Sequence, residues 1–119
     1  STYWDGSSTP TTSHRRRVDD VVLSHTAKVT GARLKITYRA YIPGGQASLA
    51  FALFRDAGAN AIDWFPLTGP GSDAVLFVTA PDTSAHTYRI AIISRDIGGL
   101  IYEAGEISRR LLTIEEYPA

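Results

Sequence analysis

The sequence predicts an all-β fold: a jelly-roll-like β-sandwich of about eight antiparallel strands, preceded by an extended N-terminal arm. Two observations predict it. Between residues 33 and 42 apolar and polar side chains alternate strictly, which is the period of a half-buried β-strand. Similar short segments recur along the chain, separated at fairly regular intervals by turns rich in Gly, Pro and Asp. Such spacing is typical of sandwiches and jelly rolls.

The composition is that of one ordinary globular domain. The 119 residues suffice to bury a core, and 44% of them are hydrophobic. Twelve basic residues balance twelve acidic ones, so we expect neither nucleic acid nor a membrane as a partner. Cysteine is absent, which excludes disulfides and thiolate chemistry. No apolar stretch approaches the roughly 20 residues that span a bilayer.

Residues 1–17 are expected to form an arm or linker, and residues 18–119 the β-sandwich domain. The arm is rich in Ser, Thr, Pro and Gly and shows no hydrophobic periodicity. It ends in a basic cluster of His14, Arg15, Arg16 and Arg17. These side chains could bind phosphate groups. We favour a solvated arm that contacts a neighbouring subunit, because two aspartates follow at once and offset the charge.

The first half of the domain contains four predicted strands, over residues 18–30, 34–42, 48–54 and 61–67. Thr30-Gly31 ends the first strand. Pro43-Gly44-Gly45 ends the second, because Gly accepts a positive φ and Pro presets its own. The segment DAGAN after the third strand is typical of a hairpin turn. Pro66 lies within the fourth strand and cannot donate to a ladder, so we expect that strand near a sheet edge.

The second half contains four more predicted strands, over residues 74–79, 86–94, 100–107 and 110–115. Ala-Pro-Asp ends the first of these, and Asp96-Ile-Gly-Gly99 turns the chain before the third. Residues 107–116 could also be read as a helix. We favour a strand because Leu112, Ile114 and Glu116 alternate and the segment contains β-branched residues.

No motif for catalysis or metal binding occurs in the sequence. The histidines at 14, 25 and 86 lack the spacing of a zinc site. Five aspartates, at 56, 63, 73, 82 and 96, fall at predicted turns. They could bind calcium in sandwich loops, but we favour the turn-forming role of Asp. Nucleophile elbows, P-loops and paired carboxylates are absent, so we expect a non-enzyme without a cofactor, with a hydrolase as a lesser alternative.

Aromatic and basic side chains are the remaining candidates for contact with a ligand or a subunit. Trp64-Phe65 beside Pro66 is the best candidate for an adhesive patch, whether for a subunit or for sugar rings. Tyr41 and Phe54 lie off the predicted core faces and, if exposed, would suit an interface. We expect Phe51, Phe77 and Tyr38 in the core. The candidate contacts are Trp4, Arg15, Arg16, Arg17, Tyr41, Trp64 and Phe65.

Four separate segments carry a resemblance to one family. Residues 3–9, YWDGSST, resemble a Tyr-Phe-Asp-Gly-Asp-Thr turn, and residues 32–38, ARLKITY, resemble an Arg-x-Tyr-x-Ile-x-Tyr strand. Residues 84–90, SAHTYRI, resemble a Gly-x-His-Thr-Tyr-x-Val strand, and residues 110–116, RLLTIEE, resemble a closing Leu-x-Val-Glu-Asp-x-Gly strand. All four patterns belong to minor tail proteins of siphophages of actinobacteria. Over roughly residues 20–119 the chain is similar to the jelly-roll-like domain of such virion structural proteins.

The resemblance implies a non-enzymatic virion protein of a tailed phage that self-associates as a trimer. Such a protein would lie at the tail tip, in a fibre or on the capsid as a decoration. It would act in assembly, stabilisation or host attachment, with other virion proteins and a host cell-surface glycan as expected partners. The alternative is a carbohydrate-binding β-sandwich module that uses Trp64 and a calcium ion held by loop aspartates.

Overall fold

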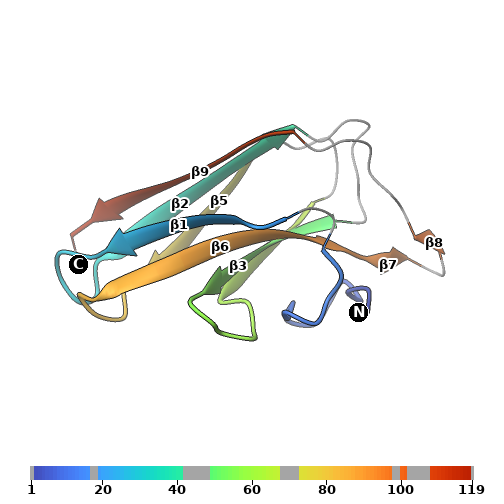
Figure 1. Cartoon of the computed structure of the whole chain (residues 1–119), viewed down its shortest axis with the longest axis horizontal. Coiled ribbons are helices and arrows are strands. Elements are labelled where there is room, and N and C mark those ends of the chain that lie inside the picture. The colour runs from blue at the N-terminus through green and yellow to red at the C-terminus, as the bar shows by residue number, and fades with distance from the viewer. Residues whose placement is uncertain are drawn as a thin grey trace.

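Nine strands form two packed antiparallel sheets and a small separate hairpin in the computed structural model (Figure 1), which describes residues 2–16, 19–41, 49–67, 73–97, 100–101 and 108–118. The strands are β1 (Val21–Thr26), β2 (Arg33–Tyr41), β3 (Leu49–Arg55), β4 (Asp63–Leu67), β5 (Asp73–Thr79), β6 (Ala85–Ser94), β7 (Asp96–Ile97), β8 (Leu100–Ile101) and β9 (Ser108–Tyr117). One sheet has the order β1-β6-β3-β4 and the other β5-β2-β9, whereas β7 and β8 pair only with each other. None of the described segments is a helix that could cross a membrane.

The predicted all-β fold is confirmed, and so are most strand positions. Residues 108–117 form a strand and not a helix, as their alternation predicts. The strand with Pro66 lies at a sheet edge, as predicted from its missing N–H. Of the strand predicted over 100–107, the first two residues are β8, and 102–107 lie outside the described residues. The turn predicted at 96–99 begins instead with the short strand β7.

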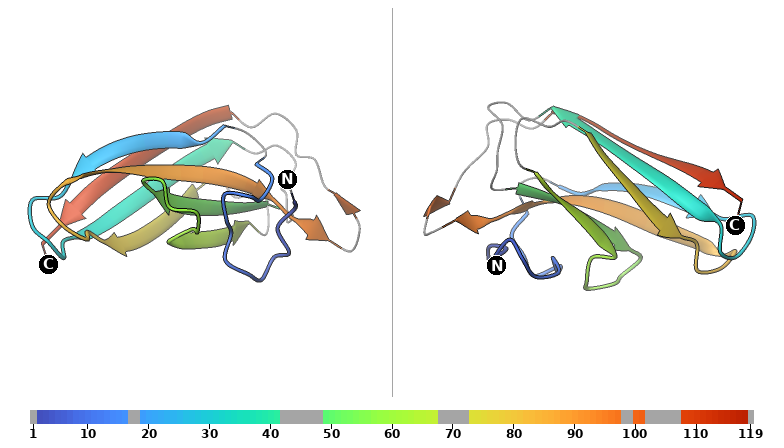
Figure 2. Two further views of the ribbon diagram at one scale, coloured as in Figure 1. Left: turned by 60° about the horizontal axis from the view of Figure 1, so that its bottom comes forward. Right: turned by 180° about the vertical axis from the view of Figure 1, so that it is seen from behind.

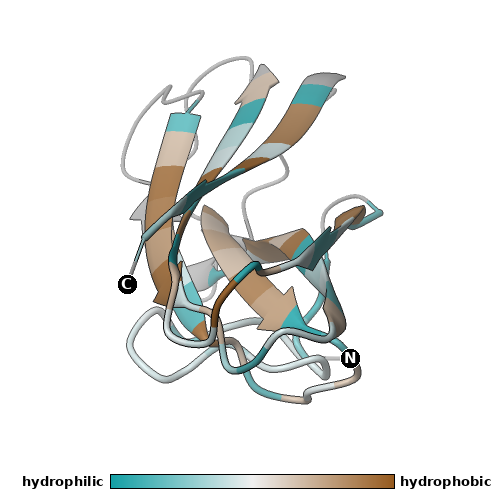
Figure 3. Ribbon diagram, turned by 90° about the vertical axis from the view of Figure 1, so that its left-hand side faces the viewer, coloured by the Kyte–Doolittle hydropathy of each residue, from teal (hydrophilic) through white to brown (hydrophobic). Residues whose placement is uncertain are grey.

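The main core lies between the two sheets and follows the alternation of β2. Leu34, Ile36, Tyr38 and Ala40 of this strand are buried, as their period of two predicts. They meet apolar side chains of β3 and β6, and the ring of Tyr38 packs edge-to-face on Phe51 at a centroid distance of 5.1 Å. Figure 3 shows hydrophobic bands on strands of both sheets.

A second core lies on the outer face of the β1-β6-β3-β4 sheet, under the N-terminal segment. Ala50, Ala52 and Phe54 of β3 are buried there beside Trp4. Residues 2–16 therefore fold back on this sheet and do not extend away as an arm (Figure 2). Phe54 lies off the main core, as predicted, but it is not exposed and so does not meet the condition for an interface, because this cover buries both faces of β3.

The strand pairings are nested, like those of one long hairpin folded over on itself. β3 pairs with β4, β2 with β5, and β1 with β6, all antiparallel. Two further pairings, β3 with β6 and β2 with β9, complete the sheets. The edge strands are consequently β1 and β4 in one sheet and β5 and β9 in the other.

Candidate functional site

Trp4 is a central side chain of the second core and is not a surface residue. Its side chain is fully buried, and its indole Nε1 donates a hydrogen bond to the Ser8 carbonyl at 2.6 Å. Its backbone N–H donates to the carbonyl of Ser94 in β6 at 2.9 Å. Trp64 packs half-buried against the same cluster. Both tryptophans therefore pack at the second core, and they do not form a free surface patch.

The basic cluster divides between surface and packing roles. The Arg15 guanidinium lies over the ring of Tyr3, 5.3 Å from its centroid, on an exposed side chain. Arg16 donates through Nε to Asp20 at 2.8 Å and lies 5.2 Å from the centroid of Phe54. Arg16 therefore fastens the N-terminal segment to the sheet. Arg17 lies outside the described residues.

Trp64 and Phe65 do not form the single adhesive patch that the sequence predicts. They are consecutive residues of β4, and consecutive strand residues point to opposite faces. Trp64 is paired in register with Ala52 of the second core, whereas Phe65 is paired with Phe51 of the main core. Phe65 is 46% exposed at this sheet edge. The backbone of Tyr41 ends β2, and its side chain lies outside the described residues.

The outward side of the β5-β2-β9 sheet, here called the open face, is the surface that the sequence patterns did not reveal. Four large apolar side chains of its two edge strands are 43–55% exposed: Val75, Phe77, Leu111 and Tyr117. The expectation that Phe77 lies in the core is wrong, because the odd-numbered residues of β5 point outward. A signal was present in the sequence: residues 74–78, AVLFV, are apolar on both sides of the strand.

Basic side chains of the central strand separate the two apolar edges of the open face. The Arg33 guanidinium lies 4.4 Å from the ring centroid of Phe77. Arg39 forms an exposed ion pair with Asp73 at 3.4 Å. A shallow depression of about 280 Å³ lies between β2 and β9 and is lined by Lys35, Thr37, Arg39, Leu111, Thr113 and Glu115. This mixture of apolar and charged groups is typical of protein interfaces.

A cluster of ionisable groups, here called the clasp, consists of Asp56, His86 and Asp82. His86 Nδ1 lies 2.6 Å from Asp56 Oδ2, and its Nε2 lies 2.7 Å from Asp82 Oδ1. Asp56 follows β3 in a left-handed conformation with φ 53°, which Asp tolerates better than most residues. The fold thus brings together one histidine and two of the aspartates expected at turns, although no spacing in the sequence connects them.

Ser84 gives the clasp an incomplete likeness to a Ser-His-Asp relay. In such a relay the histidine nitrogen facing the serine must be free to take its proton. Here Ser84 Oγ is 3.3 Å from His86 Nε2, but it donates to Asp82 Oδ1 at the shorter distance of 2.6 Å. Asp82 also occupies Nε2 itself. Asp82, and not Ser84, is therefore the closer partner of His86 Nε2, so this cluster is not arranged as a Ser-His-Asp relay.

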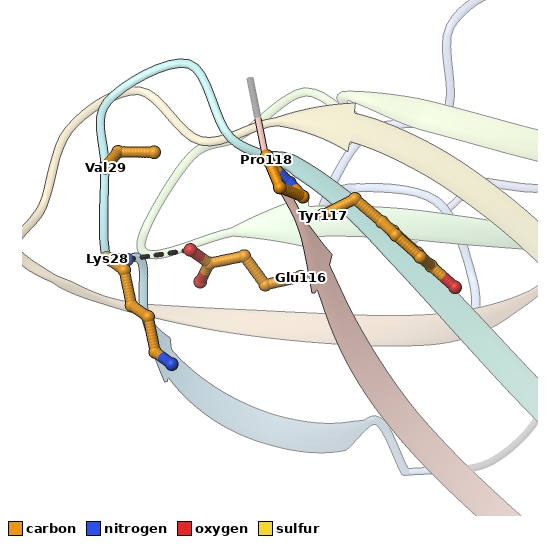
Figure 4. Close-up of a pocket in the computed structure, with 5 residues that line it drawn as sticks. All are labelled: Lys28, Val29, Glu116, Tyr117 and Pro118. Carbon is orange, nitrogen blue, oxygen red and sulfur yellow. Dashed lines mark hydrogen bonds between the residues drawn. The ribbon is translucent and has the colours of Figure 1, made fainter.

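Glu116 forms a second polar link, between β9 and the end of β1, beside a pocket of about 330 Å³ (Figure 4). Its carboxylate accepts a hydrogen bond from the Lys28 backbone N–H at 2.9 Å and lies 2.7 Å from His25 Nε2. These bonds lower the pKa of Glu116, the Lys28 N–H most. The carboxylate therefore joins the edges of the two sheets.

Among the described residues, no three His, Asp or Glu side chains are arranged to hold a metal ion. The chain matches no protein-family model, and no curated protein matches it. The function must therefore be inferred from the surfaces that the fold leaves open, and among these the open face carries four of the exposed large apolar side chains.

Proposed function

We propose that the chain is a non-enzymatic structural protein of a tailed-phage virion that self-associates through the open face. One observation carries the proposal. The chain covers the outer face of one sheet over β3 and β6 with its own N-terminal segment, but it leaves four large apolar side chains exposed on the other sheet. A second copy of the chain is the partner we propose for that uncovered face.

Exposure of this kind favours an interface for two physical reasons. Apolar side chains grouped on one face release ordered water when another protein covers them. The four side chains also lie on β5 and β9, the edge strands of the sheet, and homo-oligomers commonly cover such edges through symmetry. The ionic groups of β2 lie between them and can fix the orientation of the partner.

The virion part of the proposal rests on the four-segment resemblance and on the nested pairing. Nesting of β1 with β6, β2 with β5 and β3 with β4 is the arrangement of a small jelly roll, which supports this finer description of the sandwich. We propose a trimer, located in the tail or on the capsid with other virion proteins as neighbours. Genes for tail assembly or for the major capsid protein beside the coding sequence would support this location, and unrelated neighbours would contradict it.

A charge placed on the open face tests self-association. We expect Leu111→Lys to weaken it roughly tenfold or more, because each buried copy of the lysine would lose its hydration. The measurement is light scattering across a concentration series. The matched control is Val22→Lys, since Val22 is equally exposed, at 54%, on edge strand β1 away from this face. A monomeric wild type at micromolar concentration, or equal effects of both variants, would refute the proposal.

A carbohydrate-binding module is a second candidate, and the exposed rings of the open face favour it. Phe77 and Tyr117 are available for stacking on sugars, whereas Trp64 is half-buried. A glycan array with the wild type and Phe77→Ala separates the two functions. Glycan binding that the variant loses without a change in oligomeric state would support the module. Self-association without glycan binding would support the structural role.

A further inference from the structure

We propose that Asp56, His86 and Asp82 form a pH-sensitive clasp, which fastens the bend before β6 to the turn after β3 while His86 is protonated. The two carboxylates of the clasp come from different loops of the sandwich. Asp56 follows β3, and Asp82 lies in the bend between β5 and β6. His86, near the start of β6, lies between them. This inference is independent of the oligomeric state of the protein.

The geometry requires the charged form of the histidine. Both ring nitrogens of His86 lie within hydrogen-bond distance of a carboxylate, at 2.6 and 2.7 Å. An ionised carboxylate can only accept hydrogen bonds, so each nitrogen must carry a hydrogen. Only the imidazolium has both. The His86 side chain is 16% exposed, but the Asp56 and Asp82 side chains are 48% and 54% exposed, so the clasp lies at the surface.

The contact with Asp82 is the one that deprotonation breaks. Asp56 is fixed independently of His86: its carboxylate accepts the Thr87 N–H at 2.9 Å, and its own N–H donates to the Thr87 carbonyl at 2.8 Å. The other hydrogen bonds of Asp82 among the described residues run to Ser84, within the same bend. Neutral His86 should therefore keep its Nδ1–H on Asp56. Its bare Nε2 can then accept only from the Ser84 hydroxyl, 3.3 Å away, so the ionic link between His86 and Asp82 is lost.

The carboxylates bound to His86 favour its protonated form. Its hydrogen bonds with Asp56, and then with Asp82, raise the pKa of His86 above the ordinary 6.5. From the neighbouring strands, His25 of β1 is its register partner, and it is bound in turn by Glu116 of β9. The guanidinium of Arg55, at the end of β3, lies over the ring of Tyr88.

The pH range of the clasp follows from the signs of these shifts. Because the pKa of His86 is raised in the folded state, its contribution is complete below pH 6.5 and is lost as pH rises through the higher folded value. Ser84 and His86 lower the pKa of Asp82 to about 2, so the acid limit lies far below neutrality. The clasp is therefore closed below pH 6.5 and opens as pH rises through the raised pKa of His86.

An NMR titration of the full chain tests the clasp. We expect His86 to titrate above pH 6.5 in the wild type, and we expect Asp82→Asn and Asp56→Asn each to lower its pKa towards 6.5. Asp73→Asn is the matched control, because Asp73 is an equally exposed, ion-paired aspartate at the start of β5. It should leave the His86 titration unchanged.

Amide hydrogen exchange supplies a second readout that does not depend on any variant. In the wild type, the protection factors of the amides of residues 82–84, which correct for the base catalysis of exchange, should fall above the measured pKa of His86, while the Thr87 amide, bonded to Asp56, should keep its protection. A wild-type pKa at or below 6.5, a pKa that Asp82→Asn does not change, or unchanged protection factors across the titration would each overturn the proposal.

Discussion

At the scale of single residues, Trp4 contributes most to the packing of the N-terminal segment. It is a fully buried aromatic side chain whose neighbours, Ala50, Ala52 and Phe54, come from a strand more than forty positions along the chain. A small side chain in its place leaves a cavity that the rigid sheet below cannot fill. The stability of the cover thus depends largely on one residue.

We expect Trp4→Ala to lower the free energy of unfolding by about 3–5 kcal/mol, the range for loss of a buried large aromatic. Denaturant unfolding measures this change. Tyr3→Ala is the matched control, since Tyr3 is the neighbouring aromatic, half-exposed under the Arg15 guanidinium. A loss no greater than that of the control would show that residues 2–16 do not pack on the sheet in solution.

At the scale of elements, Glu116 connects strands that no backbone ladder joins. β1 and β9 belong to different sheets, and the carboxylate binds both His25 and the backbone after β1. A carboxyl whose pKa is lowered by folding contributes stability above its ordinary pKa, 4.5 here, and this is lost as pH falls through the folded value. The link should therefore weaken only in acid.

We expect Glu116→Gln to lower stability near neutral pH and to flatten the loss of stability that the wild type shows below pH 4.5. Denaturant unfolding from pH 3 to 7 measures both effects. Glu115→Gln, one residue away on the opposite face of β9, should keep the wild-type slope. If the Glu116 and Glu115 variants gave the same pH profile, the link between the sheets would contribute nothing.

The same scale shows how far sequence reasoning reaches. The alternation of β2 identified its buried side correctly, because one face of that strand packs on the other sheet and one faces water. The sequences of β3 and β5 lack such alternation, so the exposure of their outward sides could not be predicted from it. β3 is covered by the N-terminal segment, whereas Val75 and Phe77 of β5 remain exposed.

The clasp and the N-terminal cover could not be predicted from local patterns. Asp56 and His86 are 30 positions apart, and only the register of β3 with β6 brings them together. The N-terminal segment has no periodicity, because its contacts are single bridges and one buried ring and not a regular strand. Composition identified residues 2–16 as irregular, but irregular segments can still be tightly packed.

At the scale of the whole molecule, the outer faces of the two sheets differ in what covers them. The β1-β6-β3-β4 sheet is covered from within the chain, and the β5-β2-β9 sheet is not. If the open face joins copies of the chain, the assembly is held by one side of the sandwich. The opposite side, with the N-terminal segment, remains available to face neighbours of another kind.

A cover that belongs to the same chain behaves differently on dilution from one that a second molecule supplies. Tethering keeps the N-terminal segment at an effective concentration of roughly millimolar or more beside its sheet, whatever the protein concentration. The open face has no such tether. Dilution should consequently increase the fluorescence of an apolar dye per chain, and the emission spectrum of Trp4 and Trp64, which both pack in the second core, should stay unchanged throughout.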